Sequence, residues 1–413
     1  MEKRKAQILI IGGGFGGLFT ALELAGAGEV TIVGDDDHFV FAPMLYEYFS
    51  GEVEAWHIAP YYKDLLDERI RFVRGTVTDV DFERREARIE AQNRSLSYDI
   101  LVLAAGGVTN YWGVTGAAEN AIPFRKIRHA DELRRRMTTA LDNVPPDFAP
   151  QDVRELLTFA VVGGGASGVE LATKMADLLN DAFKRRNLKG EPRVIILEMS
   201  SEVVPGMGDD IREYVVEALR DTRVEVHTDT RVVAVKPNAI VSEHNGVQIE
   251  IQTAAVVWTA GVRVSPLIEK LNLEKDKRGL ILVKPTLQTT TRPEVFALGD
   301  IAKVADIAPT LGGTAQLAFQ ESSLTAANIK ALLAGGELKT RRFEELGEAL
   351  SLGTGNAAVL VGDRAFGGTL ARDARFALYT SRLPTWHHRL RVGASWFFEG
   401  TKPNPLEPLG ISQ

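Results

Sequence analysis

A glycine-rich motif, G-x-G-x-x-G, occurs twice in this 413-residue chain, each time between an expected strand and an expected helix. The first copy follows the aliphatic run at residues 8–11, and the second follows residues 159–162. In such a turn the first glycine permits a tight bend, the second lets the backbone approach a pyrophosphate, and the third lets the helix pack on the strand. Phosphate oxygens then lie at the positive N-terminus of the helix. The sequence therefore predicts an α/β fold with two dinucleotide sites.

The two glycine motifs supply half of the candidate cofactor contacts. Those of the first copy are Gly12, Gly14, Phe15, Gly16 and Gly17, and those of the second are Gly163, Gly165, Ser167 and Gly168. Because one chain carries both motifs, we expect one tightly held redox cofactor and one exchangeable hydride donor. The repetition also indicates a duplicated structural unit.

An acidic residue that binds the ribose is expected at the end of the second strand of each unit. Glu198 holds this place in the second unit, where its carboxylate would accept hydrogen bonds from both ribose hydroxyls and repel a 2′-phosphate. This favours NADH over NADPH. In the first unit Gly34 occupies the place. Either Asp35 takes over through a one-residue shift or the ribose is held differently, and we expect Asp36 and Asp37 to form a solvated turn.

Small residues end two further expected strands, at residues 98–103 and 256–258, and let a cofactor lie against the backbone. The candidate contacts at these strand ends are Ala105, Gly106, Ala260 and Gly261. A later strand delivers Gly299 and Asp300 to its carboxyl end, where the Asp300 carboxylate can accept hydrogen bonds from a polyol.

The composition excludes several kinds of chemistry. The chain has no cysteine, which excludes a disulfide scaffold, thiolate metal sites, iron–sulfur clusters and a redox-active dithiol. The net charge of −7 argues against a nucleic-acid partner. We expect no metal site, because the adjacent His387 and His388 point apart on a helix. No apolar run approaches the roughly 18 residues of a membrane-spanning helix, and we predict no signal peptide.

The stretch from residue 370 to residue 398 combines aromatic and aliphatic residues with arginine and contains no lysine. Its charged residues are Arg372, Asp373, Arg375, Arg382, Arg389 and Arg391. Pro384 divides the stretch into two expected amphipathic helices. Arginines opposite Trp and Phe suit an anionic membrane surface, and the alternative is an ordinary packing or dimer helix.

Taken together, these motifs resemble those of the two-dinucleotide-binding flavoproteins, and most closely the type II NAD(P)H:quinone oxidoreductases. The resemblance covers essentially the whole chain. It implies two Rossmann-like, glutathione-reductase-like domains and a C-terminal amphipathic helical module. The implied FAD-binding domain is discontinuous, at residues 1–113 and 282–335, and the implied NAD(P)H-binding domain spans 114–281. Residues 336–413 would form a module for a membrane surface or a dimer.

The resemblance also implies roles for individual residues. The first motif would bind FAD, with Asp300 on the ribitol and Pro43 against the ring system. The second would bind NADH, with NADPH left open. Ala315, Gln316 and Gln320 look like the family's quinone-site motif, with the two glutamines one helical turn apart. Glu170 resembles the family's glutamate near the nicotinamide–flavin contact, in a positioning or proton-relay role. From the residues alone, the alternative is a capping or first-turn helix glutamate favoured by the helix dipole.

The implied reaction is a non-proton-pumping, two-electron transfer from NADH to FAD and then to a membrane quinone. The segment around Pro43 is similar to that of the cyanobacterial and plastid branch, which points to plastoquinone or to a naphthoquinone such as demethylphylloquinone or menaquinone. We expect a homodimer on the cytoplasmic side of a membrane. Two alternatives are a soluble FAD-dependent NAD(P)H reductase of a small iron–sulfur carrier and a redox sensor.

Overall fold

The computed structural model describes residues 4–90, 94–145, 149–304, 314–344, 347–362 and 364–407. Two five-stranded parallel sheets form its centre. The first has the order β19 (Val295–Ala297), β7 (Ile100–Leu103), β1 (Gln7–Ile11), β2 (Glu29–Gly34), β3 (Ile70–Arg74). The second has the order β9 (Ala121–Pro123), β16 (Ala255–Trp258), β10 (Thr158–Val162), β11 (Arg193–Leu197), β12 (Glu225–His227). The predicted α/β fold with two parallel dinucleotide-binding sheets is confirmed.

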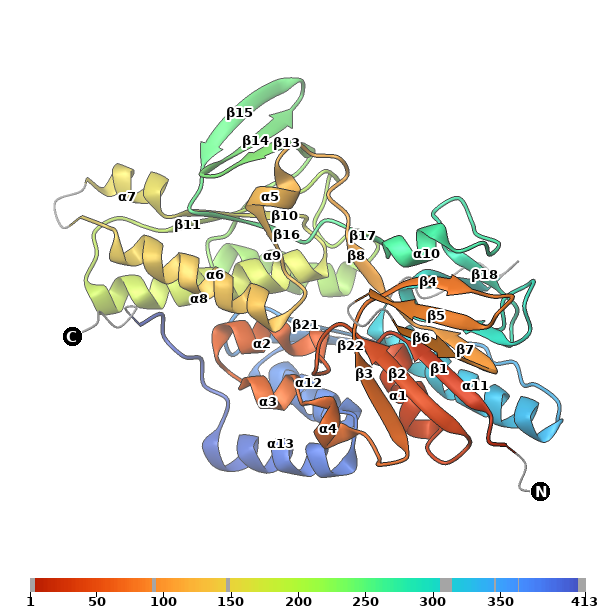
Figure 1. Ribbon diagram of the computed structural model, residues 1–413. Helices are drawn as coiled ribbons and strands as arrows, with labels where there is room; N and C mark the ends of the chain where they lie inside the picture. The colour runs from red at the N-terminus through yellow and green to blue at the C-terminus, as the bar shows by residue number, and fades with distance from the viewer. Residues whose placement is uncertain are drawn as a thin grey trace.

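The two sheets repeat one arrangement around a central strand. In the first, β1 pairs with β2 and β7, and in the second β10 pairs with β11 and β16. Each central strand leads through a glycine turn into a helix, α1 (Phe15–Glu23) or α8 (Ala166–Arg186). The central strands are mostly apolar and almost entirely buried, as expected for parallel sheets covered on both faces. Figure 1 shows the first sheet at the right and the second at the upper left.

Smaller sheets surround these two. Three-stranded antiparallel sheets are formed by β4 (Val77–Asp81), β5 (Glu86–Ile89) and β6 (Arg94–Ser97), by β13 (Thr230–Lys236), β14 (Ala239–His244) and β15 (Val247–Gln252), and by β21 (Glu348–Ser351), β22 (Ala357–Val361) and β23 (Arg364–Gly368). Two-stranded pairs are formed by β18 (Ile281–Val283) with β20 (Ala302–Val304) and by β8 (Gly107–Thr109) with β17 (Val262–Val264). The β8–β17 ribbon connects the two large sheets, since β8 follows β7 and β17 follows β16.

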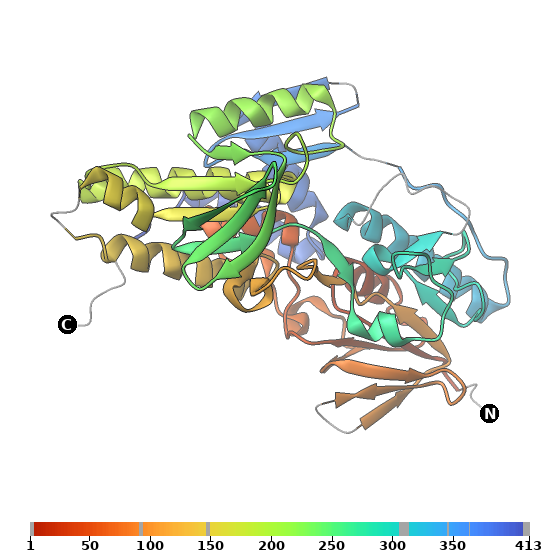
Figure 2. The same cartoon turned by 90° about the horizontal axis from the view of Figure 1, so that it is seen from above.

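The remaining helices lie along and between the sheets. They are α2 (Leu45–Ser50), α3 (Ala55–Ile58), α4 (Tyr62–Leu65), α5 (Ala117–Asn120), α6 (Ile127–Asp142), α7 (Pro150–Leu156), α9 (Asp209–Asp221), α10 (Pro266–Lys270), α11 (Ala315–Ala334), α12 (Thr369–Arg382) and α13 (Trp386–Glu399). Helix α11 packs on α1 beside the first sheet, whereas the β21–β23 sheet packs on α9 beside the second (Figure 2).

The C-terminal helices are separated at Pro384, as predicted. Helix α12 ends before this proline, and α13 begins with Thr385 as its N-cap, whose hydroxyl accepts a hydrogen bond from His388 N at 3.3 Å. Helix α13 lies along the lower edge of the molecule, beneath α3 and α12 (Figure 1). In the part of the chain that the structure describes, no helix is both long and apolar enough to cross a membrane.

Candidate functional site

The two glycine turns have matching geometry. Gly12 and Gly163 have φ angles of +114° and +104°, which favour glycine. A Cβ atom on Gly17 would lie 1.8 Å from the carbonyl oxygen of Gly12, and one on Gly168 would lie 1.9 Å from that of Gly163. Each turn therefore brings helix and strand so close that no side chain fits at the third glycine.

The second glycine of each motif faces open space. Gly14 and Gly165 are the N-caps of α1 and α8, and neither helix has a side-chain cap. A Cβ atom on either glycine would meet nothing within 4 Å. The first amide groups of each helix are thus left for an external acceptor, and the space beside them fits a pyrophosphate. We call the open space at Gly14 the first cradle and that at Gly165 the second. Beside the first cradle, the ring of Phe15 lies 5.1 Å from that of Phe39 and 5.3 Å from that of Phe41.

Gly34 and Glu198 occupy equivalent places. Gly12 N donates to Val33 O at 2.8 Å, and Gly163 N donates to Leu197 O at 2.9 Å. Gly34, after Val33, and Glu198, after Leu197, therefore have the same position relative to their glycine turns. The Glu198 carboxylate accepts hydrogen bonds from Gly164 N at 2.5 Å and from Ser200 N at 2.7 Å. Glu198 is therefore held directly against the second glycine turn.

The aspartates after Gly34 are arranged differently. Lys126 Nζ donates to Asp35 at 2.8 Å and to Asp36 at 2.6 Å. Burial would raise the pKa of Asp35, but the hydrogen bond and charge of Lys126 lower it. The expectation of a solvated turn is wrong for Asp36, because this lysine binds its side chain and leaves it only 24% exposed.

The small residues at the strand ends are also equivalent in the two units. Ala104 N donates to Ile11 O at 2.8 Å, and Thr259 N donates to Val162 O at 2.9 Å. Ala105 and Gly106 therefore lie beside the first glycine turn as Ala260 and Gly261 lie beside the second.

Asp300 follows strand β19 in a short 3₁₀ turn, and burial raises the pKa of its carboxyl group. The turn is held by Glu321, whose carboxylate accepts a hydrogen bond from Gly299 N at 2.6 Å. Burial raises the pKa of Glu321 to about 8, with the Gly299 hydrogen bond acting in the opposite direction. Glu321 is a residue of the site that the sequence motifs did not single out.

Glu170 is buried and belongs to an ionic cluster. Its carboxylate accepts hydrogen bonds from Ser351 N at 2.8 Å and from Arg375 at 3.0 Å. Burial raises the pKa of Glu170 to about 7, although the charge of Arg375 opposes the shift. Arg375 also donates to Glu47 at 2.5 Å and to Pro43 O at 2.8 Å. One guanidinium thus connects the Pro43 segment, helix α8 and helix α12.

The predicted basic face of the C-terminal stretch is wrong for two arginines. Arg375 is 2% exposed, and Arg372 donates to Glu52 at 3.3 Å and to Thr401 O at 2.6 Å. A guanidinium inside a protein needs a carboxylate partner. Both arginines can lie inward because helix α2 and the turn after it supply two carboxylates, Glu47 and Glu52. Glu52 also pairs with the buried Lys174 of α8.

The two predicted quinone-site glutamines have different surroundings. Ala315 and the partly exposed Gln316 begin α11. Gln320 is buried; its amide donates to Glu344 O at 2.8 Å and accepts from Glu344 N at 3.2 Å. The backbone of Glu344 thus occupies the Gln320 amide, whereas Gln316 has no such contact among the hydrogen bonds of the described residues.

Aromatic rings from three helices lie close to the start of α11. The ring of Phe319 lies 4.8 Å from that of Phe19 on α1, and the Arg382 guanidinium on α12 lies 5.5 Å from its centre. The ring of Tyr379, also on α12, lies 5.6 Å from that of Phe41. This aromatic wall suits a planar, apolar ring.

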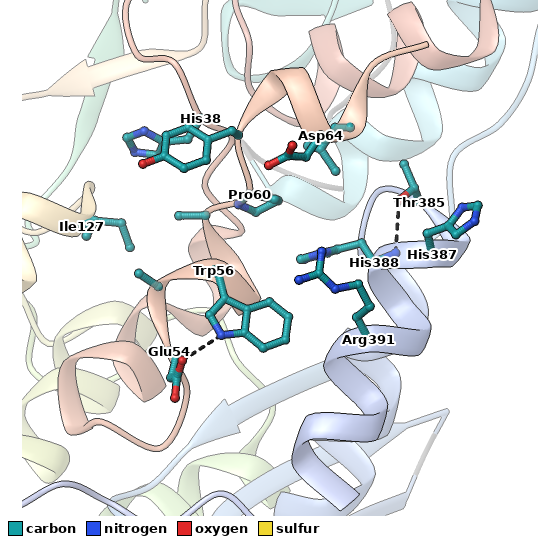
Figure 3. A pocket seen from close by; sticks show the side chains of 14 residues that line it. His38, Glu54, Trp56, Pro60, Asp64, Ile127, Thr385, His387, His388 and Arg391 are labelled. Carbon is teal, nitrogen blue, oxygen red and sulfur yellow. Dashed lines mark hydrogen bonds between the residues drawn. The ribbon is translucent and has the colours of Figure 1, made fainter. Parts of the chain in front are cut away.

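A cavity of about 560 Å³ lies elsewhere, between the segment that carries α3 and α4 and the start of α13. In Figure 3, Arg391 of α13 reaches toward Trp56, and its guanidinium lies 5.2 Å from the centre of the ring. None of the candidate site residues lines this cavity. It therefore belongs to the docking of α13 rather than to the predicted redox site.

The chain is similar in sequence and in fold to known proteins. A family model described as "Pyridine nucleotide-disulphide oxidoreductase" matches residues 6–322. Demethylphylloquinone reductase NdbB of Synechocystis sp. is 34% identical over 96% of each chain. Type II NADH:quinone oxidoreductase Ndh of Mycobacterium tuberculosis is 30% identical over 95% of this chain and 88% of its own. The structure of NDH2 from Plasmodium falciparum in complex with NADH has a TM-score of 0.87 at 18% identity, covering 98% of this chain and 100% of that one.

Proposed function

This chain belongs to the pyridine nucleotide-disulphide oxidoreductase family, and within it to the type II NAD(P)H:quinone oxidoreductases; from that premise we propose that it binds FAD at the first glycine turn, takes hydride from NADH at the second, and reduces a membrane quinone. The observation that carries this proposal is the pair of open glycine cradles in one chain that has no cysteine. Electrons must then pass to the acceptor without a thiol relay. The family assignment favours quinone reduction over the two alternatives, a reductase of a small iron–sulfur carrier and a redox sensor.

The proposed FAD-binding domain, residues 1–113 and 282–335, contains all five strands of the first sheet. Bound FAD would supply an isoalloxazine that accepts hydride and returns two electrons to the quinone. The cradle at Gly14 would hold its pyrophosphate, and Asp300 its ribitol. Phe15, Pro43 and the strand end at Ala105 would surround the remainder.

The proposed NADH-binding domain, residues 114–281, contains all five strands of the second sheet. Gly165, Ser167 and the start of α8 would hold the pyrophosphate. Glu198, held against the glycine turn by Gly164 N, would accept hydrogen bonds from the ribose hydroxyls. Its negative charge would repel a 2′-phosphate, which is the reason to propose NADH as the donor.

Quinone reduction needs two protons as well as two electrons. A carboxyl group whose pKa is about 7, as in Glu170, can hold or release a proton near neutral pH. Arg375 connects Glu170 to the backbone of Pro43, beside the proposed ring site. We therefore assign Glu170 a positioning and proton-holding role, and place the quinone ring along the aromatic wall near Gln316.

The C-terminal module, residues 336–413, is proposed to meet the membrane through α13 rather than through both helices. Trp386, Leu390, Phe397 and Phe398 are exposed on α13. Helix α12 exposes only Leu370 and Leu378 among its large apolar residues and directs Arg372 and Arg375 inward. An amphipathic helix with exposed Trp and Phe can lie in a lipid interface. The homodimer and the cytoplasmic side of the membrane remain predictions.

Vesicle flotation tests the membrane proposal. Replacing Phe397 and Phe398 by Ser should weaken binding to anionic vesicles at least tenfold, since burying one such ring contributes about 1.5–3 kcal/mol. Replacing Leu332 and Leu333 of α11, another pair of neighbouring exposed apolar residues, is the matched control. Equal loss in both pairs would contradict the assignment to α13.

Separating the two half-reactions tests the quinone proposal. Gln316→Ala should leave reduction of the enzyme by NADH unchanged and slow its reoxidation by quinone. Ser323→Ala on the same helix, whose hydroxyl bonds Glu23, is the control. Equal slowing of both half-reactions by Gln316→Ala would contradict the site. Comparing plastoquinone, naphthoquinone and menaquinone analogues in the second half-reaction would identify the preferred acceptor.

A further inference from the structure

The indole of Trp112 lies against the second dinucleotide site. Its Nε1 donates a hydrogen bond to Ala260 O at 2.8 Å. A Cβ atom on Gly261 would come within 2.9 Å of Nε1, so the ring lies directly on that glycine. Gly261 has a φ of +103° and belongs to the strand end that adjoins the Gly163 turn. Trp112 is nevertheless 69% exposed, which leaves much of its ring open to a ligand.

The backbone at Trp112 is held in an unfavourable conformation. Its φ of +53° is uncommon for a bulky residue. The Asn110 side chain accepts a hydrogen bond from Trp112 N at 3.0 Å and fixes the turn. An exposed indole gains little from burial, so the fold does not need this arrangement for its core. Residues held in such conformations without a packing benefit cluster at binding sites.

The order of the strands places Trp112 at one end of the dinucleotide. In the doubly wound fold the dinucleotide lies across the carboxyl ends of the strands, with its adenosine on the side of the strand that ends in the ribose-binding acid. Here that strand is β11, which ends before Glu198, on one side of β10. Strand β16, which leads to Ala260, lies on the other side. Trp112 therefore lies on the nicotinamide side.

The connection between the sheets gives the same placement. Trp112 follows strand β8, and β8 pairs with β17, the strand that follows Gly261. This ribbon connects the two large sheets. Trp112 therefore lies at the junction of the two domains, where the nicotinamide end of a dinucleotide bound to the second sheet would face the flavin site of the first domain. Figure 1 shows β8 and β17 at this junction.

We infer that Trp112 forms a wall of the nicotinamide half of the dinucleotide site and packs its open face against the nicotinamide ring. An indole face suits a planar ring, and it attracts the positive charge of oxidised nicotinamide. The inference rests on the proposed function, since it requires NAD(H) at the second glycine turn. It adds a binding residue that neither glycine motif contains.

Binding of NAD⁺ and of ADP-ribose, which lacks the nicotinamide, tests the inference on the FAD-loaded enzyme. Trp112→Leu should weaken NAD⁺ about 2–12-fold, the equivalent of 0.5–1.5 kcal/mol for an aromatic pair, and leave ADP-ribose unchanged. NAD⁺ should quench tryptophan fluorescence in the wild type but not in Trp112→Phe. Trp386→Phe, which removes an indole of similar exposure on α13, should keep the quenching.

Unchanged NAD⁺ affinity in Trp112→Leu would overturn the inference, as would equal weakening of NAD⁺ and ADP-ribose. If Trp112→Leu does not fold, the fluorescence of the conservative Trp112→Phe variant decides, and quenching that persists there overturns the inference. Failure of the proposed function would look different: the wild-type enzyme would then bind neither NAD⁺ nor ADP-ribose.

Discussion

The two glycine turns share their backbone and differ in the side chains that follow. Both have a first glycine at positive φ and a third glycine without room for a Cβ atom. Glu198 directly follows strand β11 of the second unit, and Gly34 has the equivalent place in the first unit. Seven residues after the first glycine, α8 carries Glu170, whereas α1 carries Phe19 in the aromatic wall. The backbone thus forms the same cradle twice. The side chains at the two differing positions, Gly34 against Glu198 and Phe19 against Glu170, make one cradle apolar and the other acidic.

The largest effects should come from filling the third glycine. Gly17→Ala and Gly168→Ala would each press a methyl group into backbone, and overpacking costs about 1–3 kcal/mol even where neighbours can move. We expect Gly17→Ala to lose FAD, and Gly168→Ala to keep FAD while its KM for NADH rises more than tenfold. Absorbance of the purified protein and steady-state kinetics measure the two outcomes.

Gly208→Ala is the control for both variants, because a Cβ atom there meets nothing within 4 Å and the backbone φ is −62°. If Gly17→Ala kept its colour and lost only NADH affinity, the two cradles would be assigned the wrong way round.

Glu198→Gln should have the next largest effect. The neutral amide would weaken charge-assisted hydrogen bonds to the ribose, each contributing roughly 1.5–3 kcal/mol, and would no longer repel a 2′-phosphate. We expect kcat/KM for NADH to fall about tenfold and the preference for NADH over NADPH to shrink. An unchanged ratio of the two kcat/KM values would refute the role of Glu198 in donor choice.

Glu170 should make the free energy of unfolding depend on pH, whereas Phe19, at the equivalent place in the first unit, does not titrate. The pKa of Glu170 rises from 4.5 to about 7 on folding. The native state therefore binds more protons than the unfolded state across this range, and the contribution of Glu170 to stability falls as pH rises from about 4.5 to 7. We expect the free energy of unfolding of Glu170→Gln to decline less over this range. Parallel curves for variant and wild type in urea titrations at several pH values would be the contrary result.

Asp35→Asn should have the smallest effect. The Asp35 side chain is 65% exposed and its partner is Lys126, and exposed ion pairs contribute about 0–1 kcal/mol. We expect FAD content and thermal stability close to those of the wild type. Loss of FAD in this variant would instead support Asp35 as the ribose-binding acid of the first unit.

The glycine turns could be predicted from the sequence because their demands are local. A positive φ or a missing Cβ atom concerns a few adjacent residues, and the motif records it. The inward direction of Arg375 could not be predicted, since its partner Glu47 lies on a distant helix and helical periodicity alone favours a basic surface. The contact of Gln320 with Glu344 could not be predicted either, because Glu344 is 24 residues away and lies outside any helix or strand.

Anaerobic stopped-flow absorbance tests the central claim most directly, since it follows both cradles in one chain. We predict that the purified, FAD-containing protein loses its yellow absorbance on mixing with NADH and regains it on mixing with a quinone, without added thiol. A protein that is colourless and cannot be reconstituted with FAD would contradict the account. So would a reduced protein that quinone reoxidises no faster than buffer.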